Sequence, residues 1–145
     1  MSQYFDIGDE TLWNPSNGAA RLFLRQVAVF EAELDLPSGF GPMENDECRI
    51  DPEAFAVFVH ALLAWHRRTG HAVVLALGEG FVGVLVALAE RAGIAVDWAR
   101  LAAFPDGPAV DVQVSAAGVS GPADGGAWAA AVRARAAELG RGMAR

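Results

Sequence analysis

The chain has 145 residues, of which 53% are hydrophobic and 20% are charged, and its formal net charge at pH 7 is −7. This length and composition predict one globular domain with a single hydrophobic core and exclude a disordered or low-complexity chain. The chain has no lysine, and its arginines form no dense basic patch, so nucleic-acid binding through phosphate contacts is not expected.

The first part of the chain predicts a short β-hairpin followed by a helix. Apolar and polar residues alternate on both sides of Gly8, as in two strands joined by a turn. Asn14 and Pro15 are a typical cap and first-turn pair, and apolar residues then recur at helical spacing, so we predict a helix over residues 15–34. Glycine and proline over residues 36–43 predict a loop.

Two longer helices are predicted in the middle of the chain. The first covers residues 52–69, where Asp51 is the expected N-cap and Pro52 the first helical residue. The second covers residues 72–92 and is almost entirely apolar, with Glu79 near its centre. A carboxylate at that position disfavours a membrane span, so we predict a buried central helix and no association with a membrane.

We predict a mainly α fold: a three-helix core, a short N-terminal β-hairpin and a weakly ordered C-terminal segment. Residues 1–104 form the helical core domain in this interpretation, and residues 105–145 are an extension made of a Gly/Ala-rich linker and an alanine-rich helix. The alternative is a small α/β domain in which residues 71–77, 94–98 and 109–114 form a sheet.

A glycine motif within the apolar segment raises the hypothesis of nucleotide binding. Gly78, Gly80 and Gly83 match the G-x-G-x-x-G pattern, and Asp97 follows at about the distance expected for a ribose-binding carboxylate. The motif requires a strand before it and alternating strands and helices around it, which this chain does not predict. We therefore favour a buried helix whose glycines allow close packing, and keep nucleotide binding through Gly78–Gly83 as the second alternative.

An acidic segment, "GPMENDECRID" at residues 41–51, contains most of the candidate functional groups. The candidate acid–base residues are the carboxylates of this segment and two polar residues of the apolar helices: Glu44, Asp46, Glu47, His60 and Glu79. The candidate ligand-binding residues are Trp13, Cys48 and Trp65. The histidines and the single cysteine lack the spacing of zinc ligands, so we predict neither a metal site nor a cofactor.

Two stretches of the chain resemble a known group of proteins. "YFDIGDETLWNPSNGAARLFLR" (residues 4–25) and "LPSGFGPMENDECRIDPEAFAVFVHAL" (residues 36–62) resemble a family of small actinobacterial proteins that is catalogued only as a domain of unknown function. The resemblance covers roughly residues 1 to 100. It implies no activity, cofactor or catalytic residue.

The sequence leaves three hypotheses for function. We favour a non-catalytic binding or accessory protein whose acidic surface contacts a basic protein partner, as an immunity protein does. The first alternative is a small enzyme or ligand-binding protein with a polar pocket between the acidic segment and the helix over 52–69, and the second is nucleotide binding. A single cysteine and a polar N-terminus predict a cytoplasmic protein, and the apolar surfaces of the two central helices are compatible with a homodimer.

Overall fold

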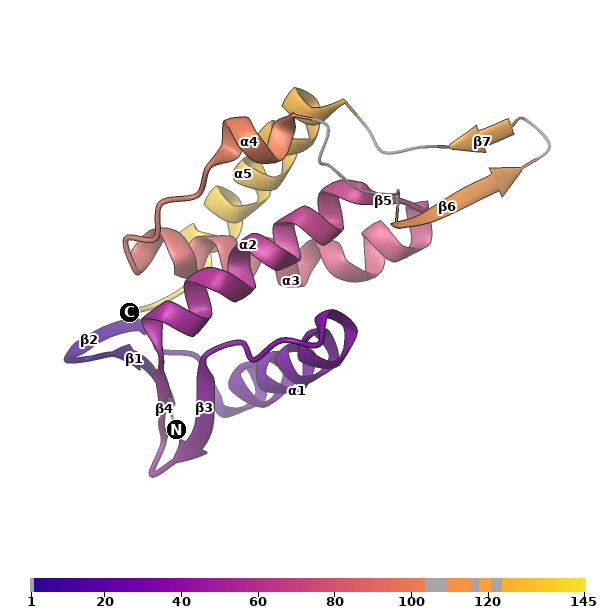
Figure 1. Ribbon diagram of the computed structural model, residues 1–145. Helices are drawn as coiled ribbons and strands as arrows, with labels where there is room; N and C mark the ends of the chain where they lie inside the picture. The colour runs from indigo at the N-terminus through magenta and orange to yellow at the C-terminus, as the bar shows by residue number, and fades with distance from the viewer. Residues whose placement is uncertain (1, 104–109, 116–117, 121–123) are drawn as a thin grey trace.

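The computed structural model describes residues 2–103, 110–115, 118–120 and 124–145, and these residues form a mainly helical fold with two small sheets (Figure 1). The elements in chain order are β1 (Tyr4–Ile7), β2 (Glu10–Trp13), α1 (Asn17–Leu34), β3 (Phe40–Glu44), β4 (Glu47–Ile50), α2 (Pro52–Arg68), β5 (Thr69–Gly70), α3 (Ala72–Arg91), α4 (Trp98–Ala102), β6 (Val110–Ser115), β7 (Gly118–Ser120) and α5 (Gly125–Gly142). The mainly α class is therefore confirmed.

The predicted N-terminal β-hairpin is confirmed, but it is half of a larger sheet. Strands β1 and β2 pair antiparallel, β1 pairs parallel with β4, and β4 pairs antiparallel with β3, which gives the order β2-β1-β4-β3. The predicted loop over residues 36–43 is wrong in its second half, because strand β3 begins at Phe40. Proline is tolerated in β3 because this strand lies at the edge of the sheet, where an N–H group is not needed for pairing.

Helices α1, α2 and α3 lie close to the predicted ranges, and polar side chains cap each of them. Asp51 accepts hydrogen bonds from the backbone of the first turn of α2, as predicted. The cap of α1 is Ser16 rather than Asn14, since the Ser16 hydroxyl accepts from the backbone N–H of Ala19 at 3.4 Å. His71 caps α3 by accepting from the N–H of Val73 at 3.3 Å.

The hydrophobic core joins the four-stranded sheet to the helices, so the prediction of a three-helix core is incomplete. Phe5 of β1 stacks on Trp13 of β2, with ring centroids 5.3 Å apart, and meets Phe23 of α1 edge to face. Phe30 of α1 stacks on Phe81 of α3 with centroids 4.6 Å apart. This chain of aromatic contacts makes the sheet part of the same core as the helices.

Helix α5 packs along α3, so the prediction of a weakly ordered C-terminal segment is wrong for this helix (Figure 1). Its buried side chains are Trp128, Val132 and Ala136. Gly83 of α3 makes the close approach possible, because a Cβ atom there would lie 2.9 Å from Leu139 Cδ1. The alanine-rich face that suggested loose docking is instead what allows two helices to approach closely. The division of the chain at residue 104 stays a prediction.

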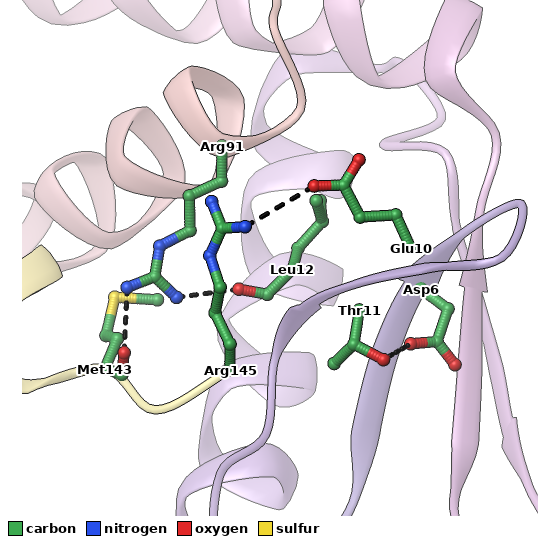
Figure 2. Close-up of polar contacts among 7 residues, drawn as sticks. All are labelled: Asp6, Glu10, Thr11, Leu12, Arg91, Met143 and Arg145. Carbon is green, nitrogen blue, oxygen red and sulfur yellow. Dashed lines mark hydrogen bonds and ion pairs between the residues drawn. The ribbon is translucent and has the colours of Figure 1, made fainter.

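The end of the chain is also fixed to the N-terminal hairpin, as Figure 2 shows. The guanidinium of Arg91 donates to the backbone carbonyls of Leu12 at 2.7 Å, Gly140 at 2.9 Å and Met143 at 2.8 Å. Arg145 forms an ion pair with Glu10 at 3.5 Å. A single arginine of α3 thus connects β2 to the C-terminal residues.

The alternative α/β arrangement is wrong in two of its three strands. Residues 71–77 are mostly within α3, and no strand covers residues 94–98, where α4 begins at Trp98. The third strand exists as β6, which pairs parallel with the short β5 and antiparallel with β7. The predicted linker lies partly in residues 104–109, 116–117 and 121–123, outside the described residues.

Helix α3 is long and apolar enough, by length and composition, to cross a membrane, and its mean hydropathy is 2.3. Half of that stretch is buried within the protein, and core helices of soluble proteins pass the same test. The absence of a membrane association therefore stays a prediction.

Candidate functional site

The acidic segment forms a tight β-hairpin rather than a loop. Glu44 at the end of β3 pairs directly with Glu47 at the start of β4, so only Asn45 and Asp46 make the turn. Both have positive φ angles, of 50° and 66°, which a type I′ hairpin turn requires and which Asn and Asp tolerate better than most residues. The turn therefore explains Asn45 and Asp46, and N-capping of α2 explains Asp51.

The carboxylates of this hairpin have few partners and are spread over its surface. Glu47 forms an exposed ion pair with Arg49 at 3.4 Å. Asp46 accepts a long hydrogen bond from the side chain of Gln3 at 3.5 Å, and its backbone carbonyl accepts from the N–H of Tyr4 at 2.8 Å. The Glu47–Arg49 contact is exposed and contributes little to stability. Glu44 and Glu47 also line a second pocket, of about 370 Å³, together with Gly41, Pro42, Asn45 and Arg49.

The predicted ligand-binding residues are core residues. Cys48 is fully buried, and its thiol donates to the carbonyl of Gly41 at 3.2 Å. Burial and the nearby Asp6 carboxylate raise the pKa of Cys48 to about 11, so its thiolate is not available as a nucleophile near neutral pH. Trp13 and Trp65 are 9% and 8% exposed and pack against Phe5 and Phe30, respectively.

The two remaining candidates, His60 and Glu79, lie on different helices and face different surroundings. His60 is half-buried on α2, and its Nδ1 lies 2.7 Å from the carbonyl of Ala56 in the preceding turn. Glu79 is exposed on α3 and makes no ion pair within the described residues. No hydrogen bond or ion pair within the described residues joins Glu44, Asp46 or Glu47 to either of them.

The nucleotide-binding interpretation of Gly78–Gly83 is wrong. These residues lie inside the continuous helix α3, which follows the two-residue strand β5 and not the buried strand that the motif requires. Asp97 is the N-cap of α4 and accepts from the backbone N–H of Arg100 at 3.0 Å. The favoured interpretation of the glycines, close helix packing, is confirmed at Gly83, where α5 approaches.

A pocket of about 440 Å³ lies where α5 meets α2 and the first half of α3. We call it the α2–α3–α5 pocket. Most of its lining is apolar, and its polar side chains come from all three helices. The lining residues are His66, Ala72, Leu75, Ala76, Glu79, Val82, Gly83, Ala127, Trp128, Ala131, Val132 and Arg135. A mostly apolar concave surface with a few polar groups is the usual form of a small-molecule site.

His66, in the last turn of α2, is the central polar residue of this pocket. It is buried, with only 6% of the residue exposed. The indole N–H of Trp128 on α5 donates to His66 Nδ1 at 2.9 Å, so Nδ1 must be unprotonated and the neutral ring carries its proton on Nε2. That Nε2 atom is buried and has no hydrogen-bond partner within the described residues.

Burial lowers the pKa of His66 below its ordinary value of 6.5, which keeps the ring neutral. The Glu79 carboxylate and the backbone carbonyl of Leu75 act in the opposite direction, since both favour the protonated ring. A Cβ atom at Gly78 of α3 would lie 3.8 Å from His66 Cδ2, the atom bonded to Nε2, so α3 faces this edge of the ring. The pocket thus presents a neutral N–H donor beside an exposed carboxylate.

Arg135 lies farther along the pocket, seven residues or about 10 Å beyond Trp128 on α5. One guanidinium nitrogen forms an ion pair with Glu138 at 3.0 Å. The Nε atom is buried without a hydrogen-bond partner within the described residues. Two donors that line the same pocket, His66 Nε2 and Arg135 Nε, are therefore unpaired.

Of the α2–α3–α5 pocket's polar residues, the sequence singled out only Glu79. The sequence does indicate a packing contact at Trp128, because it is the only aromatic residue of the alanine-rich helix α5 and a large apolar side chain needs a surface to pack against. Its partner, His66, lies 62 residues earlier in the chain, a distance that no local pattern spans. Among the described residues, no three His, Cys, Asp or Glu side chains are grouped as metal ligands.

The comparisons with known proteins agree with the resemblance seen in the sequence. The model of a family of unknown function, DUF6086, matches residues 1–145. The chain belongs to this family. The match extends beyond residues 1 to 100, which the resemblance covers, and it includes α5 and hence all of the α2–α3–α5 pocket. No curated protein and no solved structure matches the chain.

Proposed function

We propose that this DUF6086 protein is a non-catalytic ligand-binding protein that holds a small, mostly apolar molecule in the α2–α3–α5 pocket. The observation that carries the proposal is the buried, unpaired Nε2–H of His66 on the pocket wall. A buried donor without a partner is unfavourable, and a ligand with an acceptor relieves that cost when it binds. The pocket volume of about 440 Å³ is within the range of small-molecule sites.

A non-catalytic role fits the polar groups that line the pocket. Within the described part of the chain, its lining contains no serine, threonine or cysteine that could act as a nucleophile. Its histidine has one nitrogen occupied by Trp128 and a lowered pKa, which suits a fixed hydrogen-bond donor better than a residue that must gain and lose a proton.

A fragment screen tests this proposal, with the indole N–H resonance of Trp128 in a ¹H–¹⁵N spectrum as the readout. We expect aromatic fragments to shift that resonance in the wild type. Ala76→Phe, which places a ring in the pocket, should weaken the same fragments at least about tenfold. Val73→Phe is the matched control, because Val73 is 58% exposed on α3 and does not line the pocket. Fragments that leave Trp128 unchanged, or that bind Ala76→Phe equally well, would contradict the proposal.

A second candidate is the partner protein predicted from the sequence, acting in the cytoplasm on a basic protein. It is supported by the net charge of −7 and by large apolar side chains exposed on α1, where Leu22 and Val29 are 61% and 63% exposed. Size-exclusion chromatography with basic proteins encoded beside its gene tests this candidate, and it also reports the homodimer. Separate elution from every such protein would count against it.

A further inference from the structure

The polar groups of the α2–α3–α5 pocket restrict the chemistry of its ligand, an inference that rests on the proposed function. His66 supplies a donor, because Trp128 fixes the proton on Nε2. Glu79 lines the same pocket as His66, and the residue before it, Gly78, faces the ring edge that carries Nε2, because a Cβ atom there would lie 3.8 Å from His66 Cδ2. A donor and an acceptor therefore lie close together at one end of an apolar cavity.

An anionic ligand group does not fit this end of the pocket. It could accept from His66 Nε2, but it would be placed beside the exposed carboxylate of Glu79 in a chain of net charge −7. Arg135 is the cation of the lining, and it lies about two helical turns along α5 from Trp128, which holds His66 by a hydrogen bond. Arg135 is already paired with Glu138 at 3.0 Å.

A cationic ligand group fits no better. An ammonium would be attracted by Glu79, but it has no acceptor for the buried Nε2–H of His66, which would stay unpaired. The group that serves both partners carries an acceptor and a donor on neighbouring atoms and has no charge. We propose that the ligand is an uncharged molecule with an apolar body and an amide-type edge, whose carbonyl accepts from His66 Nε2 and whose N–H donates to Glu79.

Four probes with one apolar body test this assignment: 1-naphthylacetamide, 1-naphthylacetic acid, methyl 1-naphthylacetate and 2-(1-naphthyl)ethylamine. Their affinities are measured at pH 7.5 by calorimetry and by the shift of the Trp128 indole resonance. We expect the amide to bind about tenfold more tightly than the acid or the amine, because each of these leaves one pocket group unpaired or repelled. The ester keeps the acceptor but lacks the donor, so it should bind about threefold more weakly than the amide.

Glu79→Gln separates charge from hydrogen bonding at this position. It keeps an acceptor and removes the negative charge, so it should improve binding of the acid about fivefold and weaken binding of the amide about threefold, because a charge-assisted hydrogen bond becomes a neutral one. Glu90→Gln is the matched control, since Glu90 is also exposed on α3 but lies outside this pocket. It should leave all four affinities unchanged.

Each outcome separates this inference from the proposed function. Tightest binding of the acid, or equal binding of all four probes, would overturn the amide assignment while the pocket itself stays a binding site. An unchanged affinity of the acid for Glu79→Gln would also overturn it. Failure of all four probes to bind would count against the proposed function together with the assignment.

Discussion

The acidic hairpin and the α2–α3–α5 pocket are two polar regions of the molecule, and the sequence pattern indicates the first as a candidate site but not the second. The hairpin concentrates its carboxylates within a few residues; its two-residue turn accounts for Asp46, whereas Glu44 and Glu47 are exposed cross-strand partners that line a separate pocket. The pocket takes one or two polar residues from each of three helices, and it contains buried donors that have no hydrogen-bond partner among the residues the structure describes. Groups that are close in sequence are often explained locally, whereas unpaired buried groups brought together by the fold indicate a site.

The position of α5 is the feature on which the pocket depends most, and Gly125 tests it with the largest expected effect. A Cβ atom at Gly125, in the first turn of α5, would collide with the backbone carbonyl of Ala102 at the end of α4. We expect Gly125→Ala to lower the free energy of unfolding by about 3 kcal/mol, measured by urea denaturation, because backbone on both sides must move. Binding of fragments in the pocket should be lost with it.

The neighbouring glycine provides the control for that substitution. A Cβ atom at Gly126 would lie 3.4 Å from a side-chain oxygen of Asp124, which is an ordinary contact. Gly126→Ala should therefore be neutral or slightly stabilising, because alanine favours a helix more than glycine does. Equal destabilisation by the two substitutions would show that α5 responds to any change in its first turn.

Sequence patterns predicted the parts of this fold that depend on neighbouring residues. The caps and apolar spacing located α2 and α3 within one or two residues, and alternation located the N-terminal hairpin and β6. The pairing of β1 with β4 was not predicted, because it joins strands that are separated by the whole of α1. The packing of α5 was also missed, since it depends on the small size of Gly83 on another helix.

The residues of the candidate site also differ in whether a sequence pattern predicts them. Glu79 was found because a carboxylate is conspicuous in an apolar helix, and it does line the pocket. The remaining sequence candidates were chosen for their local density or for their residue type. His66 lacked any such signal, because its role comes from a hydrogen bond to Trp128 and from burial, and both exist only in the folded chain.

The pH dependence of stability tests whether His66 is held neutral, with a smaller expected effect. Its pKa in the folded protein is below the ordinary value of 6.5, so the unfolded chain binds this proton more readily. The free energy of unfolding should therefore fall as the pH is lowered through about 6.5 toward the folded pKa, by about 1.4 kcal/mol for each unit that separates the two values. Above this window, His66 should contribute no pH dependence.

Two glutamine substitutions on α2 isolate this contribution in urea denaturation between pH 5 and 8. His66→Gln keeps an acceptor for the Trp128 indole and removes the titration, so the decrease in stability below pH 6.5 should become smaller. His60→Gln makes the same change on the same helix outside the pocket and is the matched control. A wild-type profile in His66→Gln would show that other groups cause the decrease.

The smallest effect is expected where the sequence first drew attention, at the hairpin carboxylates. Glu44 and Glu47 are direct cross-strand partners, so their like charges repel each other. Among the described residues, Glu47 forms an ion pair, with Arg49, and Glu44 forms none. Glu44→Gln removes the repulsion and leaves that ion pair intact. We expect it to raise the free energy of unfolding by about 0.3 kcal/mol and to leave ligand binding in the α2–α3–α5 pocket unchanged. Loss of fragment binding in Glu44→Gln would mean that the hairpin belongs to the functional site after all, since no structural role of Glu44 predicts it.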